Sequence, residues 1–413
     1  MNVNSAPQKQ AQGPLSGIRV IDLSTVVLGP YCTQFLAEYG ADVIKIEAPQ
    51  GDSTRQIGPA VEDNMASLYL GVNRNKRSVA IDLKREEGRQ ALFKLLENAD
   101  VFVHNVRQKK LDRLGLSAAA VTECNPRLVY ASLLGFSERG PYAGRPAYDD
   151  VIQGLSGMAA LMEMQSGIPR YLPTTMADKV ASLIGVQAIL AALVERNRSG
   201  RGVTVEVPMY ESLVSFGLVE HLYGAHFSPP RERIGYPRAL LPHRRPYATQ
   251  DGYICIMPYS DHHWRSFLTA VGDKNTLSDP RFADIAARTR NIDALYERLA
   301  AHIACRSTAQ WITLCRELDI PAEQMNRLED LPNDPHLKAV GHFQQVNDPA
   351  MGTLVFPANP VSFDGWTPTP RVPPCLGEHT ESILREHGFS EHEINTLIAS
   401  GAAFRSDRNG GAS

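Results

Sequence analysis

The sequence predicts an α/β protein built on a parallel β-sheet. Residues 17–24 and 41–47 carry the apolar side chains of buried strands, and 31–39 between them has the pattern of a helix that ends at Gly40. A strand, a helix and a strand in immediate succession indicate two parallel strands joined by a right-handed crossover. The same alternation continues to about residue 140, so one sheet is expected to organise this part of the chain.

The next segments extend that sheet. Strands are expected at 78–83, 101–103 and 128–134, and helices at 85–98 and 111–116. A loop rich in glycine and proline follows at 138–150 and carries Tyr148 beside two acids, Asp149 and Asp150. Loops at sheet ends often carry function, although two adjacent acids are commonly just solvated.

A smaller α+β domain is expected after residue 226, where the chain becomes irregular and rich in proline and arginine. Later strands are expected at 252–257 and 352–360, and later helices at 263–271, 293–303, 308–318, 380–386 and 391–400. The expected divisions are a disordered lead-in at 1–14, the first part of a large domain at 15–226, a linker and small domain at 227–333, and a return to the large domain at 334–413.

The composition excludes several classes of protein. A net charge of −3 over 413 residues, without a basic stripe, argues against a nucleic-acid binder. No uninterrupted run of 18 apolar residues is present, and the first residues lack the apolar segment of a secretory signal, so no membrane span is expected. The six cysteines form no CxxC pair, which favours a reduced, cytoplasmic chain without a cysteine-based metal site.

The segment 173–211 places one acid, Asp178, just before a long apolar helix that is followed by a strand at 203–207. Apolar side chains almost all the way round this helix predict that it is buried. A carboxylate at that position can cap the helix or take part in chemistry. The segment alone leaves both interpretations open.

Two other segments bear on ligand binding. No GxGxxG motif follows the first strand, so the fingerprint of a dinucleotide-binding protein is missing. Cations in Asn73-Arg-Asn-Lys-Arg-Ser could hold a phosphate-rich ligand at a strand end, or they could form a solvated turn.

Several segments together resemble class III CoA-transferases, in the order that family has them. They are GIRVIDLSTVVLGPYCTQFLAEYGADVIKIEAPQGDSTR, LYLGVNRNKRSVAIDLK, VFVHNVRQKKLDRLGL, LVYASLLGFSERGPYAGRPAYDDVIQGLSGM, MADKVASLIGVQAILAAL and LGEHTESIL. Each is weak alone, but six collinear matches from Gly17 to about Leu384 make the resemblance specific.

The resemblance implies that Asp178 is the catalytic aspartate. It also implies a set of residues around CoA and the reacting acyl group: Val26, Val27, Lys76, Arg77, Asn105, Val106, Arg113, Tyr148 and Asp149. The chain departs from the family at Ala48, where an arginine is common, and at Gln108-Lys109, which replaces Pro-Gly. Coenzyme A would be a co-substrate, with no metal, and the architecture would be an interlocked homodimer of a Rossmann-like large domain and a small domain.

The implied reaction moves CoA between two carboxylic acids. A carboxylate nucleophile would form a mixed anhydride with the acyl group and then an aspartyl-CoA thioester. Racemases of the same fold need a histidine where this chain has Tyr148, and a non-catalytic CoA-binding protein would have lost the acid, so transfer is favoured over both alternatives.

The acids exchanged are less defined by the sequence. The glycine-rich loop of formyl-CoA transferase has no counterpart here, so a formyl/oxalate pair is not expected. Arg244 and Arg245 could hold a second carboxylate, which favours a dicarboxylate such as succinate. The alternative is that both arginines pair with acids of their own chain.

Overall fold

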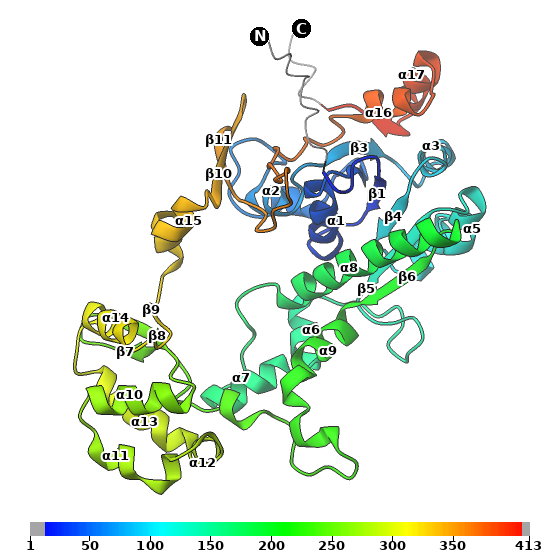
Figure 1. Ribbon diagram of the computed structural model, residues 1–413. Coiled ribbons are helices and arrows are strands. Elements are labelled where there is room, and N and C mark those ends of the chain that lie inside the picture. The colour runs from blue at the N-terminus through cyan, green and yellow to red at the C-terminus, as the bar shows by residue number, and fades with distance from the viewer. Residues whose placement is uncertain (1–12, 407–413) are drawn as a thin grey trace, which may run out of the picture. The chain divides into compact units, whose positions relative to one another are not determined.

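The structure is a computed structural model that describes residues 13–406 (Figure 1). Contacts within the chain divide it into two units. Of the described residues, the first unit contains 13–156, Pro173–Phe216 and 336–406, and the second contains Gly157–Leu172 and Gly217–Pro335. Residues 1–12 of the expected lead-in lie outside the described part of the chain.

The second unit is larger than the small domain expected from the sequence, since it includes 157–172 and 217–226. It contains helix α7 (Met158–Ser166) and the end of α9 (Met209–His221). A Cβ added to Gly217 would lie 2.1 Å from Cε of Met158, so the glycine lets the helices approach closely. Nothing in the local sequence pattern marks this contact.

The first unit is built on a seven-stranded sheet with the order β12-β3-β2-β1-β4-β5-β6. Among the described strands of this sheet, β12 pairs antiparallel with β3 and the others pair in parallel. The strands are β1 Arg19–Leu23, β2 Asp42–Glu47, β3 Arg77–Ile81, β4 Val101–His104, β5 Val129–Leu134, β6 Thr204–Pro208 and β12 Ala403–Phe404. The prediction of an α/β protein with a parallel sheet is confirmed.

Helices cover both faces of this sheet (Figure 1). One face packs against α1 and α8, and alternate strand residues such as Ile21, Phe102 and Tyr130 point to the other face, into a core shared with α3, α5, α16 and α17. The helices of the unit are α1 Leu28–Glu38, α2 Ser67–Val72, α3 Glu86–Leu96, α4 Gln108–Arg113, α5 Ala118–Cys124, α6 Asp149–Leu155, α8 Met176–Ser199, α15 Pro335–Ala339, α16 Thr380–Glu386 and α17 Glu391–Ala399.

An antiparallel hairpin, β10 (Phe343–Asp348) and β11 (Gly352–Pro357), also belongs to this unit. The sequence predicted its second strand and missed the first. The polar run Gln344-Gln-Val-Asn-Asp lacks the apolar residues that mark a buried strand.

Helix α8 differs from the prediction in two ways. It begins at Met176 after the N-cap residue Thr175, so Asp178 is the third residue of the helix rather than the residue before it. It is also not buried all round, because Leu183 is 44% and Val194 is 70% exposed. By length and composition α8 could cross a membrane, which the sequence interpretation excluded, but it packs on α1, β5 and β6 as a core helix does.

The second unit has its own core, centred on aromatic side chains such as Trp264, Phe267 and Trp311. Its antiparallel sheet contains β7 Tyr247–Ala248, β8 Tyr253–Ile256 and β9 Ala322–Gln324. Besides α7 and the end of α9, its helices are α10 Asp261–Ala270, α11 Lys274–Ser278, α12 Ile285–Arg290, α13 Ile292–Ile303 and α14 Thr308–Glu317.

Candidate active site

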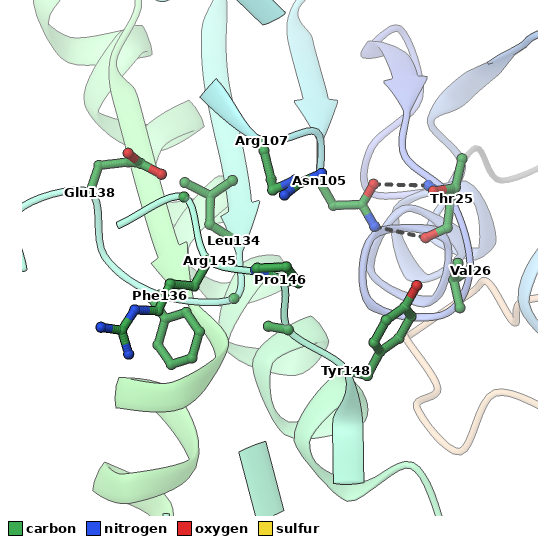
Figure 2. Close-up of a pocket in the computed structure, with 13 residues that line it drawn as sticks. Thr25, Val26, Asn105, Arg107, Leu134, Phe136, Glu138, Arg145, Pro146 and Tyr148 are labelled. Carbon is green, nitrogen blue, oxygen red and sulfur yellow. Dashed lines mark hydrogen bonds between the residues drawn. The ribbon is translucent and has the colours of Figure 1, made fainter. Parts of the chain in front are cut away.

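The C-terminal ends of β1 and β4 lie where the strand order reverses, since β1 has β2 on one side and β4 on the other. Loops that leave such a point diverge and form a crevice for ligands. The Asn105 side chain joins the two loops. Its Oδ1 accepts the N–H of Thr25 at 3.0 Å and its Nδ2 donates to Thr25 O at 2.7 Å (Figure 2). Both loops therefore form one wall of the crevice.

Val26, in the loop after β1, has a φ of 68°. This left-handed conformation is unfavourable for a β-branched residue, and such strain is concentrated at functional sites. The Asp52 carboxylate holds the loop, since it accepts the Val26 N–H at 3.2 Å. The turn into α1 is tight as well: a Cβ on Gly29 would lie 2.1 Å from Cβ of Ser24.

Four buried charged side chains support this loop, and we call them the ion cluster: Asp22, Lys45, Asp52 and Lys76. Nζ of Lys76 lies 3.0 Å from Asp22 and Nζ of Lys45 lies 3.0 Å from Asp52, with all four side chains shielded from solvent. Burial alone would raise the pKa of Asp22, but the two lysines and hydrogen bonds lower it to about 2. Burial lowers the pKa of Lys76 to about 8.

Several residues that the resemblance places around CoA and the acyl group have contacts within the fold of their own. Lys76 belongs to the ion cluster, and Arg77 forms ion pairs with Asp42 at 2.7 Å and Glu386 at 2.9 Å. Val106 packs against the sheet core, and Arg113 is exposed at the end of α4. Val27 is the buried N-cap residue of α1. Their contacts with CoA stay predictions.

Asp178 lines a cavity of about 100 Å³ with Val26, Asn105 and Tyr148, so four of the predicted residues meet there. The other lining residues all belong to the first unit: Thr25, Leu28, Leu133, Gly135, Ala147 and Met209. Of these residues only Asp178 is charged at neutral pH. The cavity is therefore a mostly apolar space with a single acid.

Asp149, also predicted near CoA, contacts Asp178 directly. Its Oδ1 accepts the backbone N–H of Asp178 at 3.0 Å. Burial and the neighbouring Asp149 raise the pKa of Asp178 to about 7. Desolvation and the second acid therefore outweigh the effect of the helix dipole on the pKa of Asp178.

A larger pocket of about 250 Å³ adjoins this cavity and shares several of its residues: Thr25, Val26, Asn105, Gly135, Ala147 and Tyr148. Arg107, Glu138 and Arg145 also line it (Figure 2). Neither arginine was predicted from the sequence. Arg107 follows two predicted CoA residues directly, which was a usable signal, whereas Arg145 stands in a loop without a pattern.

Arg244 and Arg245 lie in the second unit, where they line an open pocket of about 410 Å³ with Cys255, Met257 and Glu323. Within the described residues neither arginine forms an ion pair, while the preceding His243 contacts Asp293 at 2.8 Å. In residues 13–406 no group of three His, Cys, Asp or Glu side chains is arranged to hold a metal ion.

Comparisons with known proteins agree with this geometry. The family model described as CoA-transferase family III matches residues 15–380. An acyl-CoA transferase from Fusarium pseudograminearum is 32% identical over 408 residues, covering 95% of this chain and 90% of the relative. Formyl-CoA:oxalate CoA-transferase from Escherichia coli is 28% identical over 411 residues, covering 93% and 98%.

Solved structures show the same relationship. A CAIB/BAIF family protein from Brucella suis has 29% identity and a TM-score of 0.77, and the match covers 91% of this chain and all of that chain. A hypothetical protein from Mycobacterium tuberculosis has 28% identity and a TM-score of 0.78, with 90% and 99% covered. The chain therefore belongs to CoA-transferase family III and is a CoA-transferase.

Proposed function

We propose that this enzyme moves CoA from an acyl-CoA to a carboxylic acid by way of covalent intermediates on Asp178. The observation that carries the proposal is the cavity at the strand switch point, in which Asp178 is the one charged side chain. An apolar space excludes water, which would otherwise hydrolyse an anhydride or thioester. The lone carboxylate is then the group available for nucleophilic attack.

The reaction proceeds in balanced steps. Asp178 Oδ attacks the thioester carbonyl, the C–S bond breaks, and CoA leaves as the thiolate while a mixed anhydride forms. The thiolate attacks the aspartyl carbonyl and releases the first acid as its carboxylate, leaving an aspartyl-CoA thioester. The acceptor carboxylate then repeats both steps in reverse, so that the new acyl-CoA departs and Asp178 is regenerated.

The first turn of α1 is the proposed donor to the oxyanions. The N–H groups of Thr25 and Val26 already bond to Asn105 and Asp52, so the donors begin at Val27. Leu28, the first residue of α1, lines the Asp178 cavity. Helix N-termini present N–H groups and positive potential to a developing oxyanion.

The substrate proposal is a dicarboxylate such as succinate. Arg244 and Arg245 have no ion-pair partner within the described residues, which supports their availability for a second carboxylate. Arg107 and Arg145 suit the phosphates of CoA or the same second carboxylate.

Cytoplasmic location stays a prediction.

An interlocked homodimer is proposed for the assembly. Large apolar side chains are exposed on helices of the first unit: Val151, Leu155, Leu183, Val194 and Phe216. Exposed apolar residues in this number on adjoining helices support burial by a second subunit. Size-exclusion chromatography with light scattering tests the dimer, and a monomer would overturn this part of the proposal.

The test of the chemistry combines trapping with a substrate panel. The enzyme is incubated with succinyl-CoA, treated with hydroxylamine and digested, and the proposal expects a hydroxamate on the peptide that contains Asp178. Mass spectrometry of exchange between acyl-CoAs and mono- and dicarboxylates, formyl-CoA and oxalate included, defines the substrates. Exchange without any label on Asp178 would overturn the mechanism. The dicarboxylate proposal would be overturned if the enzyme exchanges CoA only among monocarboxylates and Arg244→Ala leaves that exchange unchanged.

A further inference from the structure

The first turn of α8 is capped by another helix. Its N-cap residue, Thr175, makes no side-chain hydrogen bond to the turn. The acceptor comes instead from Asp149, the first residue of α6, whose Oδ1 lies 3.0 Å from the Asp178 backbone nitrogen. The unpaired N–H groups of a helix start need such an acceptor. The acid that fills this role is 29 residues away in sequence.

The Asp149 carboxylate is itself held in place. Its Oδ2 accepts from Nε2 of Gln153 at 2.6 Å, and the same nitrogen lies 3.1 Å from the backbone oxygen of Thr174. Gln153 is completely buried and Asp149 is 8% exposed. Gln153 therefore links α6 to the chain just before α8.

The carbonyl side of Asp178 is held as well. Oγ of Ser182 lies 2.6 Å from Asp178 O and 2.6 Å from Leu28 O, and Ser182 is fully buried. Leu28 begins α1 and lines the cavity. The backbone of Asp178 is thus tied on one side to α6 and on the other to α1.

We infer that Asp149 is the positioning residue for Asp178: its carboxylate, oriented by Gln153, fixes the backbone that presents the Asp178 side chain to the thioester. This inference rests on the proposed function of Asp178. Asp149 lines neither of the two cavities, while its neighbour Tyr148 lines both, so Asp149 acts on Asp178 from behind the cavity wall.

The charge of Asp149 adds an effect that position alone would not have. Tyr148 is the other titratable residue in the lining, and the segments around β1, β4, β5 and β6 contribute no charged side chain to it. Lys179, the next residue on α8, points its Nζ to Oγ1 of Thr174 at 2.7 Å. Asp149 is accordingly the charge that acts on Asp178, and it raises the pKa of that carboxyl.

The experiment uses three variants of the full-length enzyme. Asp149→Asn keeps an oxygen acceptor and removes the charge, whereas Asp149→Ala removes both. Asp150→Asn is the matched control, because Asp150 is the adjacent exposed acid on α6. The rate of acyl-enzyme formation and kcat are measured from pH 5 to pH 9, and folding is checked by thermal unfolding.

We expect Asp149→Asn to move the acid limb of the pH profile down by about half a unit to one unit, because a like charge is removed. Asp149→Ala is expected to lower kcat about 10- to 100-fold with little change in KM, as misplacement of a nucleophile does. Asp150→Asn should leave both unchanged. If Asp149→Ala fails to fold, Asp149→Asn still tests the inference through the pH profile.

A profile for Asp149→Asn that coincides with wild type, or an equal shift in Asp150→Asn, would overturn the inference. That result is distinct from failure of the proposed function, which would appear as absent labelling of Asp178 in the wild-type enzyme.

Discussion

Two carboxylates near the loop after β1 have opposite surroundings. Asp22 belongs to the ion cluster, where two lysines balance its charge and its pKa is about 2. Asp178 has no cation in its cavity, stands beside a second acid, and has a pKa of about 7. The first arrangement stabilises the charged form and holds the fold, whereas the second keeps a carboxylate poorly stabilised and reactive. A catalytic role is thus expected for a carboxylate that has no neighbouring cation.

The strongest test of this difference is to remove the charge of Asp178. Asp178→Asn should lower the rate of CoA exchange at least about 10³-fold, since the amide is a poor nucleophile. Asp178→Glu should be nearly as inactive, because one methylene misplaces the attacking oxygen. The rate is measured by mass spectrometry after excluding deamidation. Transfer at more than a tenth of the wild-type rate in Asp178→Asn would contradict the assignment.

Stability should respond in the opposite sense at the two sites. Asp22→Asn leaves the buried Lys76 without its ion-pair partner and should lower the free energy of unfolding by about 3–5 kcal/mol. Asp178→Asn removes a destabilised charge and should raise it by up to a few kcal/mol at pH 8. Urea denaturation at pH 8 measures both. A loss of stability in both variants would show that the two carboxylates are not different in kind.

The pH dependence should separate activity from stability. Because Asp178 attacks as the carboxylate, kcat should fall about tenfold per unit below pH 7. Since its pKa is raised on folding from 3.8, its destabilising effect appears as the pH rises from about 4 to 7 and is absent below. Asp22 has a lowered pKa, so its stabilising effect holds above about pH 4 and is lost as the pH falls through 2. Profiles of kcat and of urea midpoints test these signs, and a flat kcat between pH 5 and 8 would contradict them.

The smallest effect is expected at Val26. Val26→Gly relieves the strain of its positive φ, which offsets the flexibility gained by the unfolded chain, so the free energy of unfolding should change by less than about 1 kcal/mol. Val27→Gly is the control, because Val27 is buried with a φ of −117°. This variant should lose about 2 kcal/mol of the free energy of unfolding. If urea denaturation shows that both variants lose the same free energy of unfolding, Val26 is not strained.

Local patterns explain what the sequence could predict. The alternation of strands and helices gave the parallel sheet, because apolar periodicity and turns are properties of neighbouring residues. The resemblance brought Val26, Asn105, Tyr148 and Asp178 together, and the structure places these four around one cavity. Their roles in catalysis stay predictions.

Contacts between distant segments explain what the sequence could not predict. Lys76 looked available for phosphate because its partner Asp22 lies 54 residues earlier, on a different strand. The cap from Asp149 to α8 and the contact of Met158 with Gly217 also join segments that are far apart in sequence. The raised pKa of Asp178 follows from burial and from Asp149, neither of which a motif records.

The double hydrogen bond from Asn105 has a consequence for redesigning this enzyme. Both bonds go to the main chain of Thr25, so the shape of the wall does not depend on the side chain at residue 25. That side chain lines both pockets and is exposed. We therefore expect that substitutions at residue 25 change the lining of both pockets without moving the main chain of the wall, as long as Asn105 is kept.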